Sequence, residues 1–348
     1  MAQVGFGIIG CGNIAPMHAR SILELEHTRL VGVADGVIER ARKTAVEFGC
    51  DAYGDFNELL ARSDVDAVCI CVPSGARCEI AEACAAAGKH VLSEKPLEVT
   101  TDRVDRIINA CDAAKVKLGC IFQSRFSKSA RHVREALDTG RFGKLVLGDA
   151  YIKWYRSQAY YDSGAWRGTW KLDGGGVLMN QGIHQIDLLL WFMGPARRVF
   201  GRTATVAHTG LEVEDLATAM IEFGNGAFGV IEGSTAVWHG HPARVEVHGT
   251  KGTAVIEDGQ LKAWEFEDAT DEDQRVREAL GADATLGSGA GDPLAALSHG
   301  GHKMQIDDFA RAILEDRAPF IEGREGRRAV ELIRAIYTSA RTGEWVSL

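Results

Sequence analysis

Short apolar runs alternate with helical periodicity along the first 123 residues. Val4–Ile9 is apolar, too short for a helix and ends at Gly10, as expected for a buried parallel strand. Regular alternation of strand and helix predicts a doubly wound parallel sheet. The predicted strands are Val4–Ile9, Leu30–Ala34, Ala67–Val72, His90–Ser93 and Lys117–Phe122. The first predicted helix follows the first strand and ends near Glu26, and the others are Val37–Phe48, Asp55–Ala61, Ala76–Ala87 and Thr100–Ala114.

A different pattern follows. Phe126–Thr139 reads as a helix, Val146–Arg156 as a long strand, and Val177–Met193 as a helix that begins after a glycine turn. Extended runs separated by glycine turns then predict a mostly antiparallel, open sheet joined by hairpins. These runs are Arg197–Ala207, Leu216–Phe223, Ala227–Val237, Arg244–His248, Thr253–Glu257 and Leu261–Phe266; beyond them, 267–292 reads as an acidic loop with a helical turn, and Gln305–Leu314 as a helix.

The predicted fold class is therefore α/β, with an N-terminal Rossmann domain over 1–123 and a C-terminal α+β domain over 124–348. A length of 348 residues agrees with two domains. A hydrophobic share of 46% argues against disorder, and a net charge of −9 without a basic stripe argues against nucleic-acid binding.

The cysteines and the N-terminus bear on location. All eight cysteines precede residue 121 and none forms a CxxC pair, so we expect reduced, mostly buried thiols and no metal site. Met1-Ala2-Gln3 lacks the basic start of a signal peptide, and no apolar stretch reaches the ~20 residues of a membrane span. We expect a cytoplasmic protein.

The first strand runs into a glycine turn that is typical of dinucleotide binding. Gly10-Cys11-Gly12-Asn13-Ile14-Ala15 is GxGxxA at a strand-to-helix junction, which allows close approach of a pyrophosphate to a helix N-terminus. Asp35 ends the second strand, where an acid binds the ribose hydroxyl of NAD and repels the phosphate of NADP. A helix-capping role for Asp35 stays open, and Arg40 keeps NADP as the minority alternative.

Ligands bind beyond the carboxyl ends of the strands of such sheets, so the residues there should surround one cofactor. Glu94-Lys95-Pro96 is the sharpest of these features: a proline turn, with a cis bond as one possibility, would aim Lys95 at a substrate hydroxyl beside the nicotinamide. A solvated lysine paired with Glu94 is the alternative. The predicted cofactor-binding residues are Gly10, Gly12, Asn13, Ile14, Asp35, Arg40, Pro73, Ser74, Glu94, Lys95 and Gln123.

The helix over Val177–Met193 carries a second candidate constellation. Asn180, His184 and Asp187 share one face of a regular helix. Oxidation of a secondary alcohol needs a base for the hydroxyl proton, and histidine suits that task near neutral pH. Asp187 could orient the ring or contact substrate. The alternative is a purely structural histidine.

Three motifs together resemble one family. Gly10-Cys11-Gly12-Asn13-Ile14, Glu94-Lys95-Pro96-Leu97 and the stretch from Gly174 to Asp187 occur in the order and spacing of the Gfo/Idh/MocA oxidoreductases, the glucose-fructose oxidoreductase and inositol dehydrogenase family. The resemblance covers essentially the whole chain, including a last helix that ends at Thr342-Gly343. It implies that Lys95 assists proton removal and that Lys95, His184, Asn180 and Asp187 are the catalytic set.

The chain departs from the inositol dehydrogenase pattern at one position. Those enzymes carry an aspartate four residues before the histidine, where this chain has Asn180. The Asn-x-x-x-His form is similar to dehydrogenases that oxidise C3 of nucleotide-linked N-acetylglucosaminuronic acid. The resemblance therefore favours glycosides or sugar nucleotides over free cyclitols.

An aromatic segment also favours a sugar. Aromatic faces pack on sugar rings, and Arg156 or Arg167 could hold a carboxylate or phosphate. A domain or subunit interface is the alternative. Residues 151–170 hold seven aromatics, Tyr151, Trp154, Tyr155, Tyr160, Tyr161, Trp166 and Trp170, and the predicted substrate-binding residues are Arg125, Tyr155, Trp166, Arg167 and His302.

The leading hypothesis is an NAD-dependent dehydrogenase that acts on a secondary hydroxyl of a sugar, glycoside, sugar nucleotide or cyclitol. One alternative is an enzyme that cleaves glycosides through a transient 3-keto sugar and recycles NAD; another is a non-catalytic NAD-binding regulator. One face of the second sheet would stay exposed without a partner, so we expect a homodimer or homotetramer through that sheet.

Overall fold

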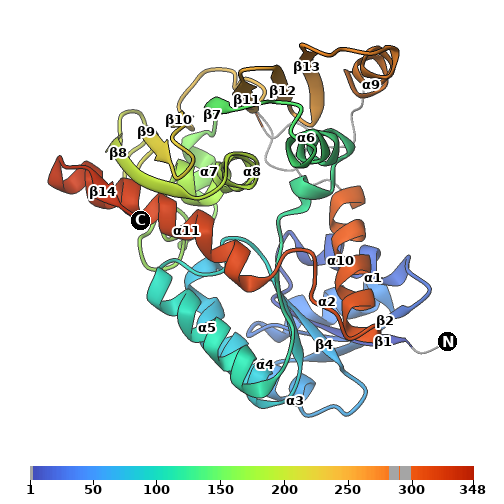
Figure 1. Cartoon of the computed structure of the whole chain (residues 1–348). Coiled ribbons are helices and arrows are strands. Elements are labelled where there is room, and N and C mark those ends of the chain that lie inside the picture. The colour runs from blue at the N-terminus through green and yellow to red at the C-terminus, as the bar shows by residue number, and fades with distance from the viewer. Residues whose placement is uncertain (1–2, 282–289, 291–298) are drawn as a thin grey trace. The chain divides into compact units, whose positions relative to one another are not determined.

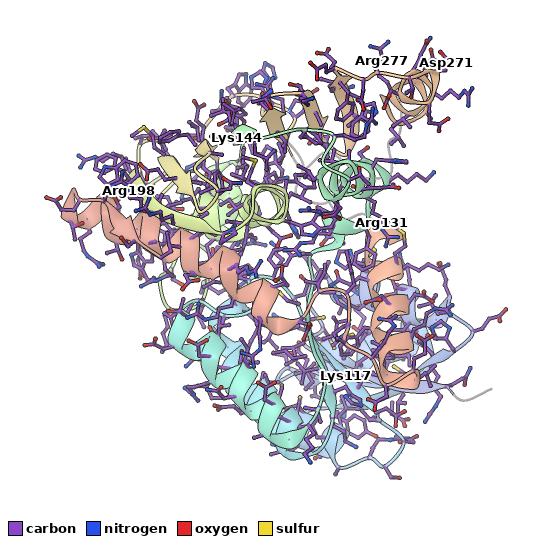
Figure 2. All side chains as sticks on the ribbon, in the orientation of Figure 1. Lys117, Arg131, Lys144, Arg198, Asp271 and Arg277 are labelled. Carbon is purple, nitrogen blue, oxygen red and sulfur yellow. The ribbon has the colours of Figure 1, made fainter. Side chains whose placement is uncertain are left out.

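The computed structural model describes residues 3–281, 290 and 299–348. The chain divides into two compact units (Figure 1). The first comprises Met1–Gln123 with His299–Arg327, and the second comprises the described residues of Ser124–Ser298 with Arg328–Leu348. Figure 2 adds the side chains, with labels on charged residues such as Lys117 of the first unit and Arg198 of the second.

The first unit is built on a six-stranded sheet whose paired strands are all parallel. Its order, β3-β2-β1-β4-β5-β6, is that of a dinucleotide-binding fold, with the change of direction between β1 and β4. The predicted doubly wound sheet is confirmed. Its strands are β1 (Val4–Ile9), β2 (Thr28–Ala34), β3 (Asp51–Tyr53), β4 (Ala67–Ile70), β5 (His90–Ser93) and β6 (Leu118–Cys120).

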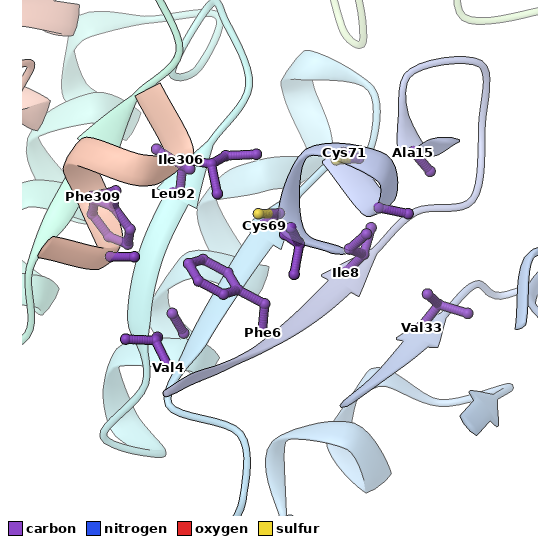
Figure 3. Close-up of a cluster of buried hydrophobic side chains, with 14 of the residues drawn as sticks. Val4, Phe6, Ile8, Ala15, Val33, Cys69, Cys71, Leu92, Ile306 and Phe309 are labelled. Carbon is purple, nitrogen blue, oxygen red and sulfur yellow. The ribbon is translucent and has the colours of Figure 1, made fainter. Parts of the chain in front are cut away.

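Helices cover this sheet, and one of them comes from the far end of the sequence. Ile306 and Phe309 on α10 pack into the same core as Phe6 of β1 and Leu92 of β5 (Figure 3). Gln305, also on α10, donates to the Cys120 carbonyl and accepts from the Phe122 amide at 3.0 Å. The helices of this unit are α1 (Ala15–Leu23), α2 (Ile38–Phe48), α3 (Phe56–Leu60), α4 (Arg77–Ala86), α5 (Thr101–Ala114) and α10 (His299–Leu314), with a 3₁₀ turn η1 (Ser74–Ala76).

The second unit is built on an eight-stranded, mostly antiparallel sheet of order β13-β12-β11-β7-β10-β9-β8-β14. The predicted sheet is confirmed, and β7 and β10 form its one parallel pair in the described ranges. Its strands are β7 (Leu145–Lys153), β8 (Ala196–Ala204), β9 (Leu216–Phe223), β10 (Phe228–Ser234), β11 (Arg244–Gly249), β12 (Gly252–Glu257), β13 (Gln260–Phe266) and β14 (Val346–Ser347).

Alternation of burial along these strands separates the two faces of the sheet. In β9, Ala217, Ala219, Ile221 and Phe223 are buried while the residues between them are exposed or half-buried. The helices of this unit are α6 (Lys128–Asp138), α7 (Gln158–Asp162), α8 (Ile183–Met193), α9 (Asp271–Gly281) and α11 (Gly323–Thr342). The first five residues of α11 belong to the first unit.

Two predictions about helices in this unit were wrong. Val177–Met193 is not one regular helix: Val177–Gln181 is a π-helix, η3, and α8 begins after Gly182. The acidic stretch after β13 contains an eleven-residue helix, α9, rather than a loop with a turn. Asp273, buried on α9, accepts hydrogen bonds from Arg141 and from the Trp264 indole. These contacts stabilise a helix in a segment whose acidic residues had suggested a loop.

The prediction that the cysteines are mostly buried thiols is confirmed. None of the eight, all in the described part of the chain, forms a disulfide, and six are buried. Burial raises the pKa of the Cys50 thiol to about 11, and does the same for Cys11. Among the described helices, none has the length and apolarity that crossing a membrane requires.

Candidate functional site

The turn after β1 has two glycines with different reasons to be glycine. Gly10 has a φ of +98°, and a side chain there would lie 2.8 Å from the Cys71 backbone, so the protein itself requires glycine. A side chain at Gly12 would meet no described atom within 4 Å. The open space at Gly12 fits close approach by a ligand phosphate at the start of α1, which has no side-chain cap.

Asp35 lies where a ribose-binding acid is expected, at the end of β2. Its Oδ2 accepts from the Cys11 amide at 2.9 Å, and its Oδ1 accepts from the Val37 amide at 2.8 Å. Each carboxylate oxygen has a second lone pair, so both can still receive ribose hydroxyls. Asp35 thus ties the glycine turn to β2, and Arg40 is exposed on the first turn of α2.

Backbone carbonyls on both sides of Lys95 are held by one buried guanidinium. Arg77, 5% exposed, donates to the carbonyls of Glu94 (2.7 Å) and Pro96, and its Nε donates to the Val72 carbonyl at 3.0 Å. The Lys95–Pro96 bond is cis, one of the predicted possibilities. Arg77 therefore fixes the loop that carries Lys95 relative to the end of β4.

Beneath this loop, Glu94 joins two buried histidines. His18 Nε2 on α1 lies 2.8 Å from Glu94 Oε1, and His302 Nε2 on α10 lies 3.3 Å from the same oxygen. Burial alone opposes ionisation, but the hydrogen bonds from His18 and His302 outweigh it and hold the pKa of Glu94 well below its usual range. Burial lowers the pKa of His18, so this ring is neutral near neutral pH.

His18, Glu94 and His302 also form one of two sets of donor atoms in the described residues that could hold a metal ion; the other is Asp149, Glu246 and His248 on the sheet of the second unit. Spacings of 2.8 and 3.3 Å are those of hydrogen bonds. The expectation of no metal stays a prediction. His302, predicted to bind substrate, is 2% exposed and takes part in this network, and its substrate role stays a prediction.

The structure brings most of the predicted cofactor residues to the carboxyl ends of the strands of the first unit. Ser74 and Gln123 are buried there, Pro73 and Lys95 are half-buried, and Gly12 and Asn13 are exposed. The side-chain amide oxygen of Gln123, Oε1, is buried with no hydrogen-bond partner among the described residues. Such an atom fits a site that a ligand completes.

The remaining predicted residues, Arg125, Tyr155, Trp166, Arg167, Asn180, His184 and Asp187, belong to the second unit. Asn180 lies on the π-helix and donates from Nδ2 to Asp173 Oδ1 at 2.5 Å. Asp187 on α8 accepts hydrogen bonds from Arg125 Nε at 2.8 Å and from Arg125 Nη2 at 2.6 Å. Both side chains are at most 3% exposed. Arg125 and Asp187 thus share a buried bidentate pair, a stable but desolvated arrangement.

The aromatic segment divides between core and surface. Trp154 and Tyr161 are buried, whereas Trp170 is 41% exposed and packs edge-on against Tyr337. Arg167 lies over the rings of Tyr160 (4.1 Å) and Trp166 (4.5 Å). Its Nη1 donates to the Tyr160 hydroxyl at 2.6 Å. Only part of the segment is therefore available to a sugar.

Sequence reasoning missed three supporting residues: His18, Arg77 and Glu214. His18 and Arg77 occupy helices directly after strand ends, and that position was their only signal. Glu214 is a buried glutamate that accepts from the Gly176 amide at 2.9 Å, the Leu178 amide at 3.0 Å and the Tyr337 hydroxyl at 2.9 Å. Burial raises the pKa of Glu214 to about 7, because these hydrogen bonds only partly offset desolvation.

Comparisons with known proteins agree with this geometry. Residues 4–122 match the model of the oxidoreductase family with an NAD-binding Rossmann fold, so the chain is an oxidoreductase with a nicotinamide-dinucleotide fold. Residues 130–255 match the GFO/IDH/MocA C-terminal domain. The chain belongs to the GFO/IDH/MocA family, and the resemblance inferred from the motifs is confirmed.

Three relatives illustrate the range of the family. The WlbA dehydrogenase of Bordetella pertussis, solved with NADH and UDP-GlcNAcA, is 31% identical with a TM-score of 0.91 over 100% of this chain and 98% of its own. The myo-inositol 2-dehydrogenase of Thermotoga maritima is 30% identical over 71% of this chain and 73% of its own. The D-xylose 1-dehydrogenase (NADP(+)) 2 of Haloferax volcanii is 26% identical over 99% of both chains.

Proposed function

We propose that this chain is an NAD-dependent dehydrogenase of a nucleotide-linked sugar acid. The coarser part of this statement, hydride transfer between an alcohol of a sugar or cyclitol and NAD, follows from the family and from dehydrogenase relatives. One observation carries the finer part: similarity to WlbA, bound to NADH and UDP-GlcNAcA, extends over the entire chain. Asn180, in place of the aspartate of inositol dehydrogenases, supports the same choice.

Each proposed catalytic residue has a separate task. NAD, when bound, supplies the hydride acceptor, and the open space at Gly12 with the carboxylate of Asp35 fits its phosphate and ribose. His184 takes the hydroxyl proton at a ring nitrogen, since imidazole exchanges protons near neutral pH. Lys95 binds the hydroxyl oxygen and stabilises the negative charge that develops on it. Asn180, held by Asp173, orients the substrate.

The substrate anion would be held by the second unit. Arg167 is stacked on Tyr160 and Trp166, and a guanidinium matches a carboxylate or phosphate bidentately. Tyr155 and Trp166, both half-buried, supply ring faces for a sugar. Asp187 acts on this set through Arg125, which its carboxylate holds, rather than through contact with substrate.

The test is a panel of UDP-GlcNAcA, UDP-glucuronic acid, UDP-GlcNAc, myo-inositol and glucose with NAD, measured by NADH absorbance. We expect turnover to be highest with the UDP-linked acids. Turnover of myo-inositol alone would contradict the substrate class. Release of an aglycone without net NADH would favour glycoside cleavage, and NAD binding without any turnover would favour a regulator; the dehydrogenase relatives favour neither alternative.

Variants test the assigned residues. Lys95→Ala and His184→Ala should each lower kcat by about 10²–10⁴-fold, the range that proton-transfer groups contribute. Lys43→Ala, which removes an exposed lysine from α2, is the matched control and should leave kcat unchanged. Full activity of Lys95→Ala would remove this mechanism.

The preference for NAD over NADP belongs to the proposal too. Asp35 supports it because its charge would repel a ribose phosphate. Asp35→Ala should weaken the binding of NAD more than the binding of NADP. Asp35→Asn removes the charge but keeps an oxygen that can accept from the Cys11 amide, so it separates the two effects. Equal weakening of both cofactors, measured by calorimetry, would contradict the assigned role.

We also propose a homodimer or homotetramer formed through the sheet of the second unit. Leu147 of β7, Met220 of β9 and Phe228 of β10 are 37%, 51% and 57% exposed, and Leu147 pairs directly with Phe228. An apolar surface on one sheet face is typical of an interface. Light scattering should give a multiple of the 37.6 kDa chain, reduced by Phe228→Glu. A monomer at every concentration would contradict this.

A cytoplasmic location completes the proposal. Eight cysteines without a disulfide fit a reducing compartment. Detection of the protein in a secreted or periplasmic fraction of its own cells would contradict it.

A further inference from the structure

We infer that Glu214 is a positioning residue: it holds the first turn of the π-helix and thereby places Asn180 and His184. This inference rests on the proposed function, because those two residues are assigned there to substrate orientation and proton removal. Glu214 itself lies in the connection between β8 and β9, far from both in sequence.

The triple glycine before the π-helix is explained by Glu214 and Tyr337. A side chain at Gly175 would lie 2.1 Å from the Tyr337 hydroxyl, and one at Gly176 would lie 1.7 Å from the Glu214 carbonyl oxygen. Gly174 has a φ of +82°. The loop is therefore pressed against two residues that reach it from other elements, and only glycine permits that approach.

Glu214 replaces the cap that the π-helix lacks. No side chain of its own segment caps η3. Instead, the Glu214 carboxylate accepts from the amides of Gly176 and Leu178, and its carbonyl accepts from the Val177 amide at 3.2 Å. Three successive amides are bound to a single residue, which satisfies donors that the first turn of a helix otherwise leaves without a partner.

The direction of the π-helix follows from this contact. Asn180 donates its own amide to the Gly176 carbonyl at 2.9 Å, and Gly182, which ends η3 and precedes His184, donates to the Val177 carbonyl at 2.7 Å. A shift of the Gly176–Leu178 turn is therefore carried to Asn180 and to the start of α8. Misplacement of reacting groups by about 1 Å can lower a rate by roughly 10²-fold.

The titratable groups around Glu214 come from several elements. Tyr337 of α11 donates to it, and the pKa of Tyr337 is raised by burial and by the charges of Glu214 and Asp173, with Arg334 opposing. The neighbouring carboxylate of Asp215 is bound by the amides of 206–208 and by the His208 ring. No cation lies within ion-pairing distance of the Glu214 carboxylate in the described part of the chain.

Glu214→Gln tests the inference, with Glu212→Gln, an exposed glutamate two residues away, as the matched control. We expect Glu214→Gln to raise amide exchange over 176–182 and to lower kcat by about 10–100-fold. The NAD dissociation constant, measured by calorimetry, should not change, because the glycine turn and Asp35 belong to the first unit. Glu214→Asp, one methylene shorter, should not restore the rate, whereas Tyr337→Phe should show an intermediate loss.

The outcomes separate this inference from the proposed function. Faster exchange with unchanged kcat would overturn the positioning role and leave the dehydrogenase intact. If the wild type oxidises no sugar in the panel, the proposed function fails; histidine NMR then decides, because unchanged exchange and an unchanged His184 signal in Glu214→Gln would overturn the inference. If Glu214→Gln does not fold, Tyr337→Phe with the same measurements decides it.

Discussion

Glu94 in the first unit and Glu214 in the second are both buried, at 5% and 4% exposed. Glu94 lies in the turn that carries Lys95, and Glu214 binds the turn that precedes Asn180. Glu94 is bound by two imidazoles beside the buried charge of Arg77, and its pKa lies well below the usual range despite burial. Glu214 is bound by two amides and a phenol, and burial raises its pKa to about 7. Similar burial thus accompanies opposite shifts of the carboxyl pKa, because the partners differ in how far they stabilise charge.

The largest expected effect is on Glu94. Glu94→Ala removes the carboxylate that His18 and His302 share and a negative charge near buried Arg77, so we expect the free energy of unfolding to fall by about 3–5 kcal/mol. Urea denaturation at neutral pH measures it, with Glu82→Ala, a surface ion-pair residue, as the control. A loss as small as that of the control would mean that the network stabilises little.

The next effect depends on pH. The folded-state pKa of Glu214 is raised from its ordinary value of 4.5 to about 7, so its contribution to stability is fully present below pH 4.5 and is lost as pH rises through 7. The stability of the wild type relative to Glu214→Gln should therefore decrease by about 3 kcal/mol across this window. A difference that is flat from pH 5 to 8 in urea titrations would show that Glu214 ionises normally.

His18 should show the opposite dependence. Its folded pKa is lowered, so its contribution is present above its ordinary pKa of 6.5 and is lost as pH falls below it. His18→Phe should destabilise the protein by about 1.5–3 kcal/mol at pH 7.5, the value of a hydrogen bond to a charged group, and by less at pH 5.5. His239→Phe, on an exposed histidine, is the control; a loss that grows at low pH would contradict the comparison.

Tyr337→Phe should have the smallest effect, about 1 kcal/mol, because it removes one hydrogen bond to Glu214 and leaves the ring in place. A double-mutant cycle with Glu214→Gln isolates this contact in the same urea experiments. Strictly additive losses would show that the phenol and the carboxylate are not coupled.

The two regions also differ in how far the sequence revealed them. Gly10, Gly12, Asp35 and Lys95 follow directly after predicted strands, and parallel strands bring such positions to one edge of a sheet. The local order of residues therefore predicted the first region well. Its supports, His18 and Arg77, come from helices, where the order of the strands does not indicate which side chains reach the loop of Lys95.

In the second region the spacing of Asn180, His184 and Asp187 was interpreted with the period of a regular α-helix. The π-helix breaks that period, and its first turn is bound by Glu214, which lies more than 30 residues later in the chain. The Arg125–Asp187 pair also joins residues 62 positions apart. Contacts at such separations are decided by packing, to which a single sequence gives no access.

The return of α10 to the first unit has a consequence for biosynthesis. Ile306 and Phe309 fill the core around Phe6 and Leu92, so a ribosome that has synthesised residues 1–123 has not yet produced part of that core (Figure 3). The second unit likewise includes Arg328–Leu348. Neither unit can complete its folding before its part of 299–348 has been synthesised, and apolar surface of the first unit stays available to chaperones until then.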